Sequence, residues 1–192
     1  PAVLEGHDSS RQEVRPFDCI IGGVNLDSQY LLYEPPGYDG GEEVPLMLFL
    51  HGAGERGDNI ELLKRNGPPM LIEQGRDFSS LVASLQCPAG VWWRADHISL
   101  FLDHMLETCR VDTDRIYITG LSMGGFGTWN IGAARNDLPA ALVPICGGGD
   151  VATAPDLVGI PTWAFHGDAD TTVPLWRSEQ MVNAVIREGG KP

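Results

Sequence analysis

The sequence predicts an α/β fold of three layers, in which a mostly parallel central sheet carries helices on both faces. Three observations lead to this prediction. Two apolar strand-like runs come first, later apolar runs alternate with segments of helical periodicity, and turn-rich loops follow three of those later runs. Ligands bind such sheets at the carboxyl ends of the strands, so we expect a site where these loops converge.

The predicted elements follow one another in a regular order. Residues 14–21 and 26–33 form a hairpin through Gly22 and Gly23, and the apolar run 46–50 suits a central parallel strand. We expect the later strands at 81–85, 115–119, 140–146 and 162–166, with helices at 98–109, from residue 125 on, and at 181–186, the last one ended by Gly189 and Gly190.

Composition limits the classes of function. The 192 residues suit one domain, and no run of 18 apolar residues is present. A net charge of −13 argues against nucleic acid and anionic membrane surfaces as partners. We expect a monomer that is secreted or periplasmic, with its signal peptide outside this sequence.

The four cysteines form no C-x-x-C pair, so zinc and redox motifs are not indicated. Buried free thiols are expected for Cys87 and Cys146, whereas disulfides among Cys19, Cys87, Cys109 and Cys146 stay open. The histidines are scattered, and neither an H-E-x-x-H motif nor a dinucleotide fingerprint is present, so we expect no metal and no cofactor.

The segment 120–124 reads Gly-Leu-Ser-Met-Gly and lies between the predicted strand 115–119 and a predicted helix. A strand, G-x-S-x-G and a helix in this order are typical of a nucleophile elbow, a tight turn that lifts the serine hydroxyl above the sheet. Ser122 is therefore the candidate nucleophile. A plain Gly/Ser loop is the alternative interpretation.

A serine nucleophile needs a histidine base, a carboxylate that orients the histidine, and backbone donors for the oxyanion. The loop after the strand at 162–166 offers Asp168 and Asp170, and we favour Asp170 as the acid. The oxyanion donors are expected at the amides of Met123 and Ala53, because Ala53 lies in the glycine-rich loop after the strand 46–50.

Further segments extend this pattern over the chain: 30–33, 50–59, 86–88, 91–93, 114–125, 144–150 and 166–174. Through them the chain resembles α/β-hydrolases, specifically small serine esterases of the polyhydroxybutyrate depolymerase and feruloyl esterase type, over about residues 14 to 190. The resemblance implies the α/β-hydrolase fold, with Ser122 as nucleophile, Asp170 as acid, and Ala53 and Met123 as oxyanion donors. It also suggests Trp93 and Gly54 as substrate contacts, although a buried structural role for Trp93 is an equal alternative.

The resemblance places the catalytic histidine after one more strand. We expect this histidine beyond residue 192, on a further segment of about 20 to 30 residues that also carries a closing helix. Residues 1–192 then form a single domain without its last strand, histidine loop and helix. His7, in a Gly-His-Asp-Ser sequence that resembles the missing loop, is the alternative base.

The other four histidines have simpler interpretations. His51 and His166 each precede a glycine at the end of a predicted strand and are expected to be structural. His97 and His104 are expected to be exposed helix residues.

Together these features predict a carboxylic ester hydrolase that acts on short-chain acyl or phenolic esters through an acyl-enzyme intermediate. Its substrate is a small-molecule or polymer-attached ester. The alternatives are a thioesterase or peptidase on the same fold, or a non-catalytic binding module if no general base exists.

Overall fold

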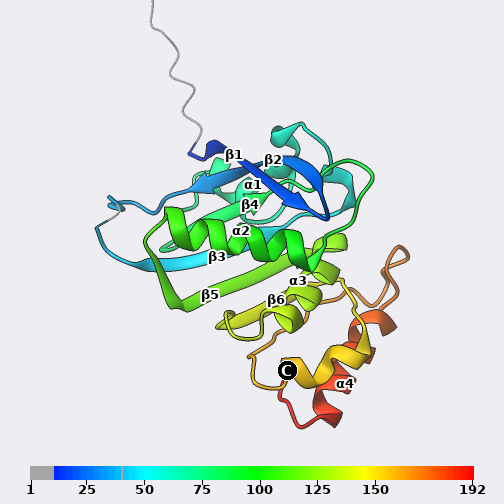
Figure 1. Ribbon diagram of the computed structural model, residues 1–192. Coiled ribbons are helices and arrows are strands. Elements are labelled where there is room, and N and C mark those ends of the chain that lie inside the picture. Colours follow the sequence, from blue (N-terminus) through cyan, green and yellow to red (C-terminus); the bar gives the residue numbers. More distant parts are fainter. Residues whose placement is uncertain (1–10, 40) are drawn as a thin grey trace, which may run out of the picture.

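The computed structural model describes residues 11–39 and 41–192 (Figure 1). Their strands form one sheet in the order β1-β2-β4-β3-β5-β6, in which β1, β2 and β4 pair antiparallel and the pairs from β4 to β6 are parallel. The strands are β1 Glu13–Ile21, β2 Val24–Tyr33, β3 Val44–Leu50, β4 Leu81–Leu85, β5 Val111–Leu121 and β6 Ala141–Ile145. The mostly parallel sheet predicted from the sequence is confirmed.

Helices lie on both faces of this sheet. The α-helices are α1 Gly67–Glu73, α2 Ala95–Thr108, α3 Met123–Ala134 and α4 Trp176–Arg187, and the 3-10 helices are η1 Ala53–Glu55, η2 Ile60–Arg65 and η3 Val151–Leu157. Helices α2 and α3 cover one face, whereas the short α1 packs on the other through Ile72, next to Tyr33 and Val82. The sequence did not predict α1, η1, η2 or η3, which are short elements within connecting segments.

The predicted strand at 162–166 is only partly formed. Thr162 and Phe165 make isolated parallel bridges to Leu142 and Ile145 of β6. Between the two bridges lies Pro144, which has no amide hydrogen to donate to the neighbouring segment, so the ladder is interrupted there. The segment still lies beside β6, at the edge of the sheet that the described residues form.

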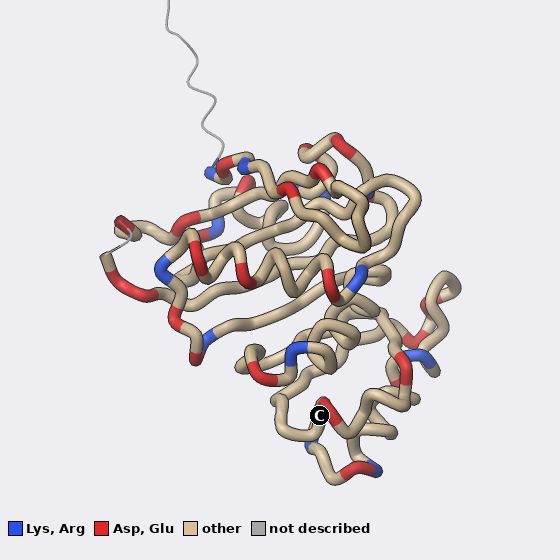
Figure 2. Tube along the Cα trace, in the orientation of Figure 1, with Lys and Arg blue, Asp and Glu red and all other residues tan. Residues whose placement is uncertain are grey.

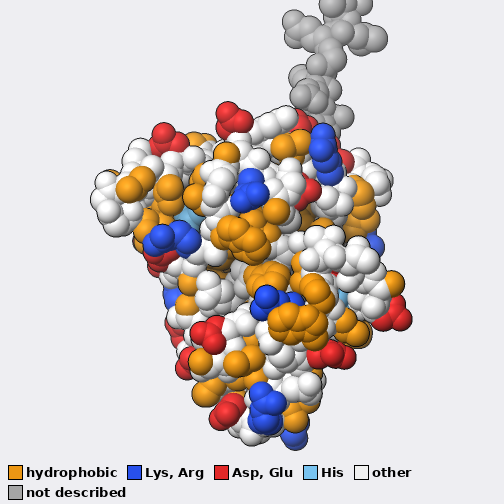
Figure 3. Space-filling model, turned by 90° about the vertical axis from the view of Figure 1, so that its right-hand side faces the viewer, with side chains coloured by type: hydrophobic (Ala, Val, Ile, Leu, Met, Phe, Trp, Pro, Cys, Tyr) orange, Lys and Arg blue, Asp and Glu red, His pale blue; other side chains and the backbone are white. Residues whose placement is uncertain are grey.

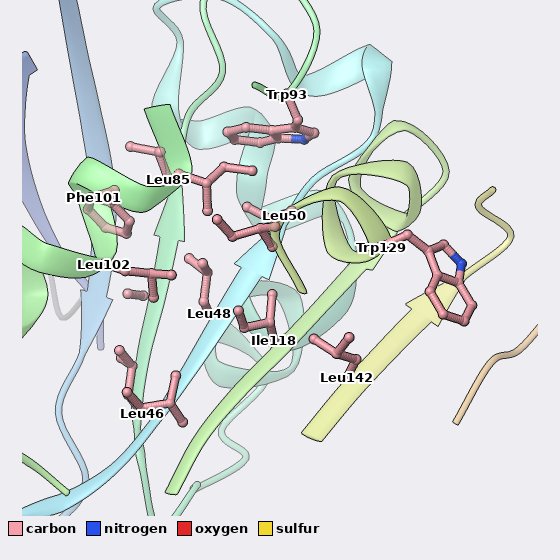
Figure 4. Packing of buried hydrophobic residues seen from close by; sticks show 14 of the residues in the cluster. Leu46, Leu48, Leu50, Leu85, Trp93, Phe101, Leu102, Ile118, Trp129 and Leu142 are labelled. Carbon is pink, nitrogen blue, oxygen red and sulfur yellow. The ribbon is translucent and has the colours of Figure 1, made fainter. Parts of the chain in front are cut away.

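The main core lies between the sheet and the α2/α3 layer (Figure 4). Alternate residues of β3 and β5, such as Leu48 and Ile118, point into it and are fully buried. The intervening residues of β5, Tyr117 and Leu121, face the α1 side and are half-buried. On that side a cavity of about 450 Å³ opens over β3, β5 and β6, because α1 covers only part of the face.

Charged residues are spread over the described part of the chain. Figure 2 shows Asp and Glu along most loops and helices, with Lys and Arg dispersed among them. Among the described residues no helix has the length and apolar character needed to cross a membrane. All four cysteines are free in the structure. Cys87 is buried, as predicted, whereas Cys146 is only half-buried, so the prediction of a buried thiol there was wrong.

Candidate active site

The turn after β5 holds Ser122 in an unusual backbone conformation. Its φ is 55° and its ψ is −115°, and a non-glycine residue in such a region costs about 1–3 kcal/mol. Two hydrogen bonds maintain this turn: the Ser122 amide donates to Ile145 O at 2.9 Å, and the Phe126 amide donates to Ser122 O at 3.1 Å. Strand β6 and helix α3 thus both fix the serine, as the predicted nucleophile elbow requires.

The glycines of the elbow allow the turn to lie directly against β3. A Cβ added to Gly124 would lie 1.8 Å from Leu50 O, and one added to Gly120 would lie 2.3 Å from Gly124 O. These neighbours are backbone atoms, which have no rotamer to change. The flanking glycines are therefore required by the close approach of helix α3 to the end of β3.

The two predicted oxyanion donors, Met123 and Ala53, come from segments next to Ser122. Met123 is the first residue of α3, where helix amides lack intrahelical partners and the helix dipole favours negative charge. Gly52, which precedes Ala53, faces the elbow: a Cβ added there would lie 3.8 Å from Ser122 Cβ. Ala53 and Gly54 are exposed at the start of η1.

Asp170 is the better ordered of the two candidate acids. Its Oδ1 accepts the amides of Val173 at 2.9 Å and Thr172 at 2.8 Å, and these bonds lower the pKa of the carboxyl below its usual range. Asp168 is exposed and makes no hydrogen bond with its side chain among the described residues. The geometry thus favours Asp170, a fixed carboxylate, over Asp168.

Cys146 lies near both Ser122 and Asp170, and sequence reasoning did not assign it to the site. Burial raises the pKa of its thiol, the Ser122 backbone lowers it, and the Asp170 carboxylate raises it again. Both groups are therefore close enough to act on the same thiol. Its position at the carboxyl end of the predicted strand 140–146 was a usable signal.

His51 is held in a structural role. Its side chain is 1% exposed, its Nδ1 donates to Gly52 O at 2.6 Å, and its Nε2 accepts the Cys87 amide at 2.9 Å. Burial lowers the pKa of this imidazole to about 4. His51 thus connects the loop at Gly52 to the loop at Cys87, in agreement with the structural interpretation of its position.

His166 is also engaged away from Ser122. Its Nδ1 contacts Ser178 Oγ at 2.7 Å and its Nε2 contacts Val173 O at 2.7 Å. Asp170 Oδ2 lies 3.7 Å from Nε2. Both nitrogens therefore bind the loop and helix around the acid, as expected of a structural histidine.

The prediction for His97 and His104 was wrong. His97 is 3% exposed and stacks on Phe17 of β1, and His104 is half-buried, with Nε2 at 3.2 Å from Tyr30 Oη. Strands β1 and β2 therefore cover more of α2 than its apolar stripe indicates. His7 lies outside the described residues.

Trp93 has the buried structural position that the sequence offered as one of two alternatives, and its role as a substrate contact stays a prediction. It is 5% exposed, and its Nε1 donates to His51 O at 3.0 Å, which places it beneath the oxyanion loop. It also lines a cavity of about 260 Å³ next to Met123. Hydrophobic side chains gather in the middle of the face that Figure 3 shows.

No protein-family model and no curated protein sequence matches the chain. Several solved structures match the chain. A thermostable esterase superposes with a TM-score of 0.78 at 30% identity, over 93% of this chain and 52% of that one. An acylaminoacyl peptidase from Pyrococcus horikoshii gives 0.70 at 17% identity, over 94% and 36%. A putative dipeptidyl aminopeptidase IV from Bacteroides ovatus gives 0.73 at 11% identity, over 97% and 32%.

The sheet order, the elbow and these neighbours together define the class of the fold: the chain has the α/β-hydrolase fold. It spans about half the length of the thermostable esterase and about a third of each peptidase. The closer resemblance to the polyhydroxybutyrate depolymerase and feruloyl esterase type stays a prediction.

Proposed function

We propose that this protein is a serine carboxylic ester hydrolase that acts on short-chain acyl or phenolic esters. The observation that carries the proposal is the elbow itself. Ser122 is held at φ 55° between β5 and α3, with Gly52 of the oxyanion loop facing it. A serine hydroxyl at the N-terminus of a helix, beside the exposed loop that contains Ala53, suits attack on a carbonyl carbon.

The reaction has two stages. A histidine base takes the Ser122 proton while Oγ attacks the ester carbonyl, and the amides of Ala53 and Met123 bind the negative oxygen. The C–O bond to the alcohol then breaks, and the protonated histidine donates its proton to the leaving oxygen. In the second stage the same base activates a water that hydrolyses the acyl-serine and releases the acid. Asp170 orients this histidine.

We place the base on a segment of the protein beyond residue 192. Among the described histidines, none is hydrogen bonded to Ser122, and His51 and His166 have both nitrogens engaged elsewhere. The sheet face opposite α3 also supports a further segment, because its 450 Å³ cavity is lined largely by apolar residues. Trp163 and Phe165, at the adjoining edge, are 70% and 42% exposed. A strand and helix that cover this face would bring a histidine loop to the same end of the sheet.

A nucleophile test and a base test keep the two parts of the proposal separate. In the full-length protein, Ser122→Ala should abolish hydrolysis of 4-nitrophenyl acetate and labelling by a fluorophosphonate probe. Ser79→Ala, at an exposed serine of the loop before β4, is the matched control and should retain both. Retained turnover in the Ser122→Ala protein would refute the nucleophile.

The base test compares the 192-residue chain with the full-length protein. The shorter chain should lack ester turnover, because it has Ser122 and Asp170 without the base. Full activity of the shorter chain would place the base within residues 1–192, while leaving Ser122 as the nucleophile.

A peptidase is the second candidate, since two of the structural neighbours are peptidases. The thermostable esterase is 30% identical to the chain, against 17% and 11% for these two peptidases, which favours the ester. A panel of acetyl, butyryl, octanoyl and feruloyl esters, with N-acyl amino acid amides beside them, distinguishes the two. Faster turnover of the amides would overturn the ester assignment.

A further inference from the structure

We propose that His166 is a buried imidazolium, with a hydrogen on each ring nitrogen, and that its charge keeps the catalytic histidine unprotonated to a lower pH. His166 is not the general base in this role. It is a positioning residue that acts through Asp170, so the role rests on the proposed function of Asp170 as the acid of the triad. The hydrogen bonds around the two ring nitrogens of His166 support it.

The Nε2 atom of His166 faces a backbone carbonyl. It lies 2.7 Å from Val173 O. A carbonyl oxygen has lone pairs and no hydrogen, so this contact is a hydrogen bond only if Nε2 carries the hydrogen. The amide of Val173 also donates to Asp170 Oδ1, so the bond from Nε2 fixes the loop that holds the acid.

The Nδ1 atom of His166 faces a serine hydroxyl whose hydrogen is already used. Nδ1 lies 2.7 Å from Ser178 Oγ, and the same Oγ donates to Gly147 O at 2.8 Å. A hydroxyl has one hydrogen, so it cannot donate to both. Ser178 and Gly147 are buried, and Gly147 O has no other donor among the described residues. A neutral ring that took the hydroxyl hydrogen would leave this buried carbonyl unpaired, so Nδ1 is also a donor and the ring is a cation.

His51 shows the arrangement expected of a neutral ring. Its Nδ1 lies 2.6 Å from Gly52 O, whereas its Nε2 accepts the Cys87 amide at 2.9 Å. One nitrogen must donate and the other must accept, which only the uncharged imidazole can do. His166 differs because each of its nitrogens faces an oxygen that needs a hydrogen. The two histidines therefore differ in charge.

The charged groups around His166 favour a cation. The charged and titratable side chains of the neighbouring elements are Asp168 and Asp170 of its loop, Arg177 and Glu179 of α4, and Cys146 after β6. The His166 side chain is 2% exposed, and Asp170 Oδ2 lies 3.7 Å from its Nε2. Glu179 lines the same cavity of about 340 Å³ as His166, whereas Arg177 stacks on the neighbouring tryptophan ring. Burial raises the pKa of the Cys146 thiol, which stays uncharged. The charge around His166 is thus net negative, which offsets the desolvation of a buried imidazolium.

A cation beside Asp170 changes what this carboxylate does for the base. The amides of Val173 and Thr172 occupy Oδ1, so Oδ2 is the oxygen left for the catalytic histidine. His166 lies beside that same oxygen. The base becomes an imidazolium when it takes the serine proton, and a second positive charge near the carboxylate disfavours its protonation by water. The base should therefore stay neutral and active at a lower pH than with Asp170 alone.

The same hydrogen bonds connect the acid loop to the elbow helix. Gly147, whose carbonyl accepts the Ser178 hydroxyl, packs directly on α3, because a Cβ added to Gly147 would lie 2.3 Å from Gly125 C. Helix α3 begins with the residue after Ser122. The hydrogen-bonded chain from Val173 to Gly147 therefore joins the loop of the acid to the helix that follows the nucleophile.

The charge of His166 can be measured by ¹⁵N NMR on the full-length protein without substrate, with the signals assigned by their loss in His166→Gln. At pH 7.5 His166 should show two protonated ring nitrogens, whereas His51 should show one and serves as the neutral reference in the same spectrum. Ser178→Ala removes the acceptor at Nδ1 and should convert His166 to the neutral form. Ser84→Ala, at a buried serine whose hydroxyl has no partner among the described residues, is the matched control and should leave the His166 signals unchanged. A neutral His166 in the wild type would overturn the inference and leave Ser122 as the nucleophile.

The effect on the base can be measured as the pH profile of kcat/KM for 4-nitrophenyl acetate. His166→Gln retains a hydrogen-bonding side chain without the charge, so the acid limb of the profile should move up by about 0.4 pH unit or more, the effect of one charge about 7 Å away in water. His104→Gln, at the half-buried histidine beside Tyr30, is the control and should leave the limb in place. A lower rate of His166→Gln with an unmoved acid limb would show a purely structural role and would overturn the tuning of the base. A cationic His166 in a wild-type protein that neither hydrolyses esters nor reacts with a fluorophosphonate probe would refute the proposed function alone.

Discussion

Replacing Gly124 by alanine should damage both the fold and the nucleophile. The added Cβ would lie 1.8 Å from Leu50 O, 2.5 Å from Leu50 C and 2.9 Å from His51 O. Each of these atoms belongs to the backbone at the end of β3, so no side-chain rotation relieves the contact. Helix α3 and β3 must separate by more than an ångström, and the elbow is the connection between them.

The size of the effect follows from this geometry. Overpacking in a core costs about 1–3 kcal/mol, and a clash between two backbones belongs at the upper end of that range. For a domain of this size each kcal/mol lowers the melting temperature by about 2–4 °C, so about 3 kcal/mol corresponds to a loss of about 6–12 °C. Strand β3 also leads into Gly52 and the oxyanion loop, so Ser122 should react more slowly with a fluorophosphonate probe.

Calorimetry and labelling kinetics of the full-length protein measure the two effects. Gly159→Ala is the matched control, because a Cβ added there meets nothing within 4 Å and should change the melting temperature by no more than about 2 °C. If Gly124→Ala melts within about 2 °C of the wild type and labels at the same rate, the close approach of α3 to β3 is not a constraint, and the reasoning fails.

Three further predictions concern titratable groups. Burial lowers the pKa of His51 from 6.5 to about 4, so the unfolded chain binds more protons than the folded protein between these pH values. The free energy of unfolding should therefore fall by about 3 kcal/mol as the pH drops from 6.5 to 4. Urea titrations of the His51→Gln variant should show a smaller fall. The Val173 and Thr172 amides lower the pKa of Asp170, so its carboxylate stabilises the folded protein at neutral pH and loses this effect in acid. The difference in free energy of unfolding between the wild type and Asp170→Asn should shrink as the pH falls through the usual carboxyl range. A difference that stays constant with pH would contradict the assignment. Burial raises the pKa of the Cys87 thiol to about 12, so the native protein holds almost no thiolate there at pH 8. Iodoacetamide at pH 8 should therefore modify Cys87 in urea but not in the native protein. Peptide mass mapping measures this difference.

Local signals were sufficient to predict most of the fold. The apolar run 46–50 and the β-branched run 115–119 lie within β3 and β5, because a buried strand requires continuous apolar character whatever surrounds it. The elbow was predictable for a similar reason. Its glycines are dictated by contacts with β3, which is a constraint that leaves a five-residue pattern in the sequence.

The hydrophobic periodicity of helix α2 does not predict how much of its surface is buried. Its apolar stripe predicts one buried face, yet Phe17 of β1 also contacts the rings of His97 and His104. The antiparallel strand β1 continues the sheet past β2, and this extension widens the part of α2 that is covered. A histidine at the margin of the stripe is then buried by a segment some 80 residues earlier, and no local pattern in α2 carries that information.

The cavity next to Met123 was unpredictable for the same physical reason. Trp92, Asn130 and Asp150 come from three separate segments, and each has an ordinary interpretation as a loop or surface residue. They line one cavity because α3 crosses from the end of β5 to the start of β6, which returns the chain to the same edge of the sheet. The elbow around Ser122 is therefore encoded locally, whereas residues of separate segments that line one cavity are brought together only by the fold.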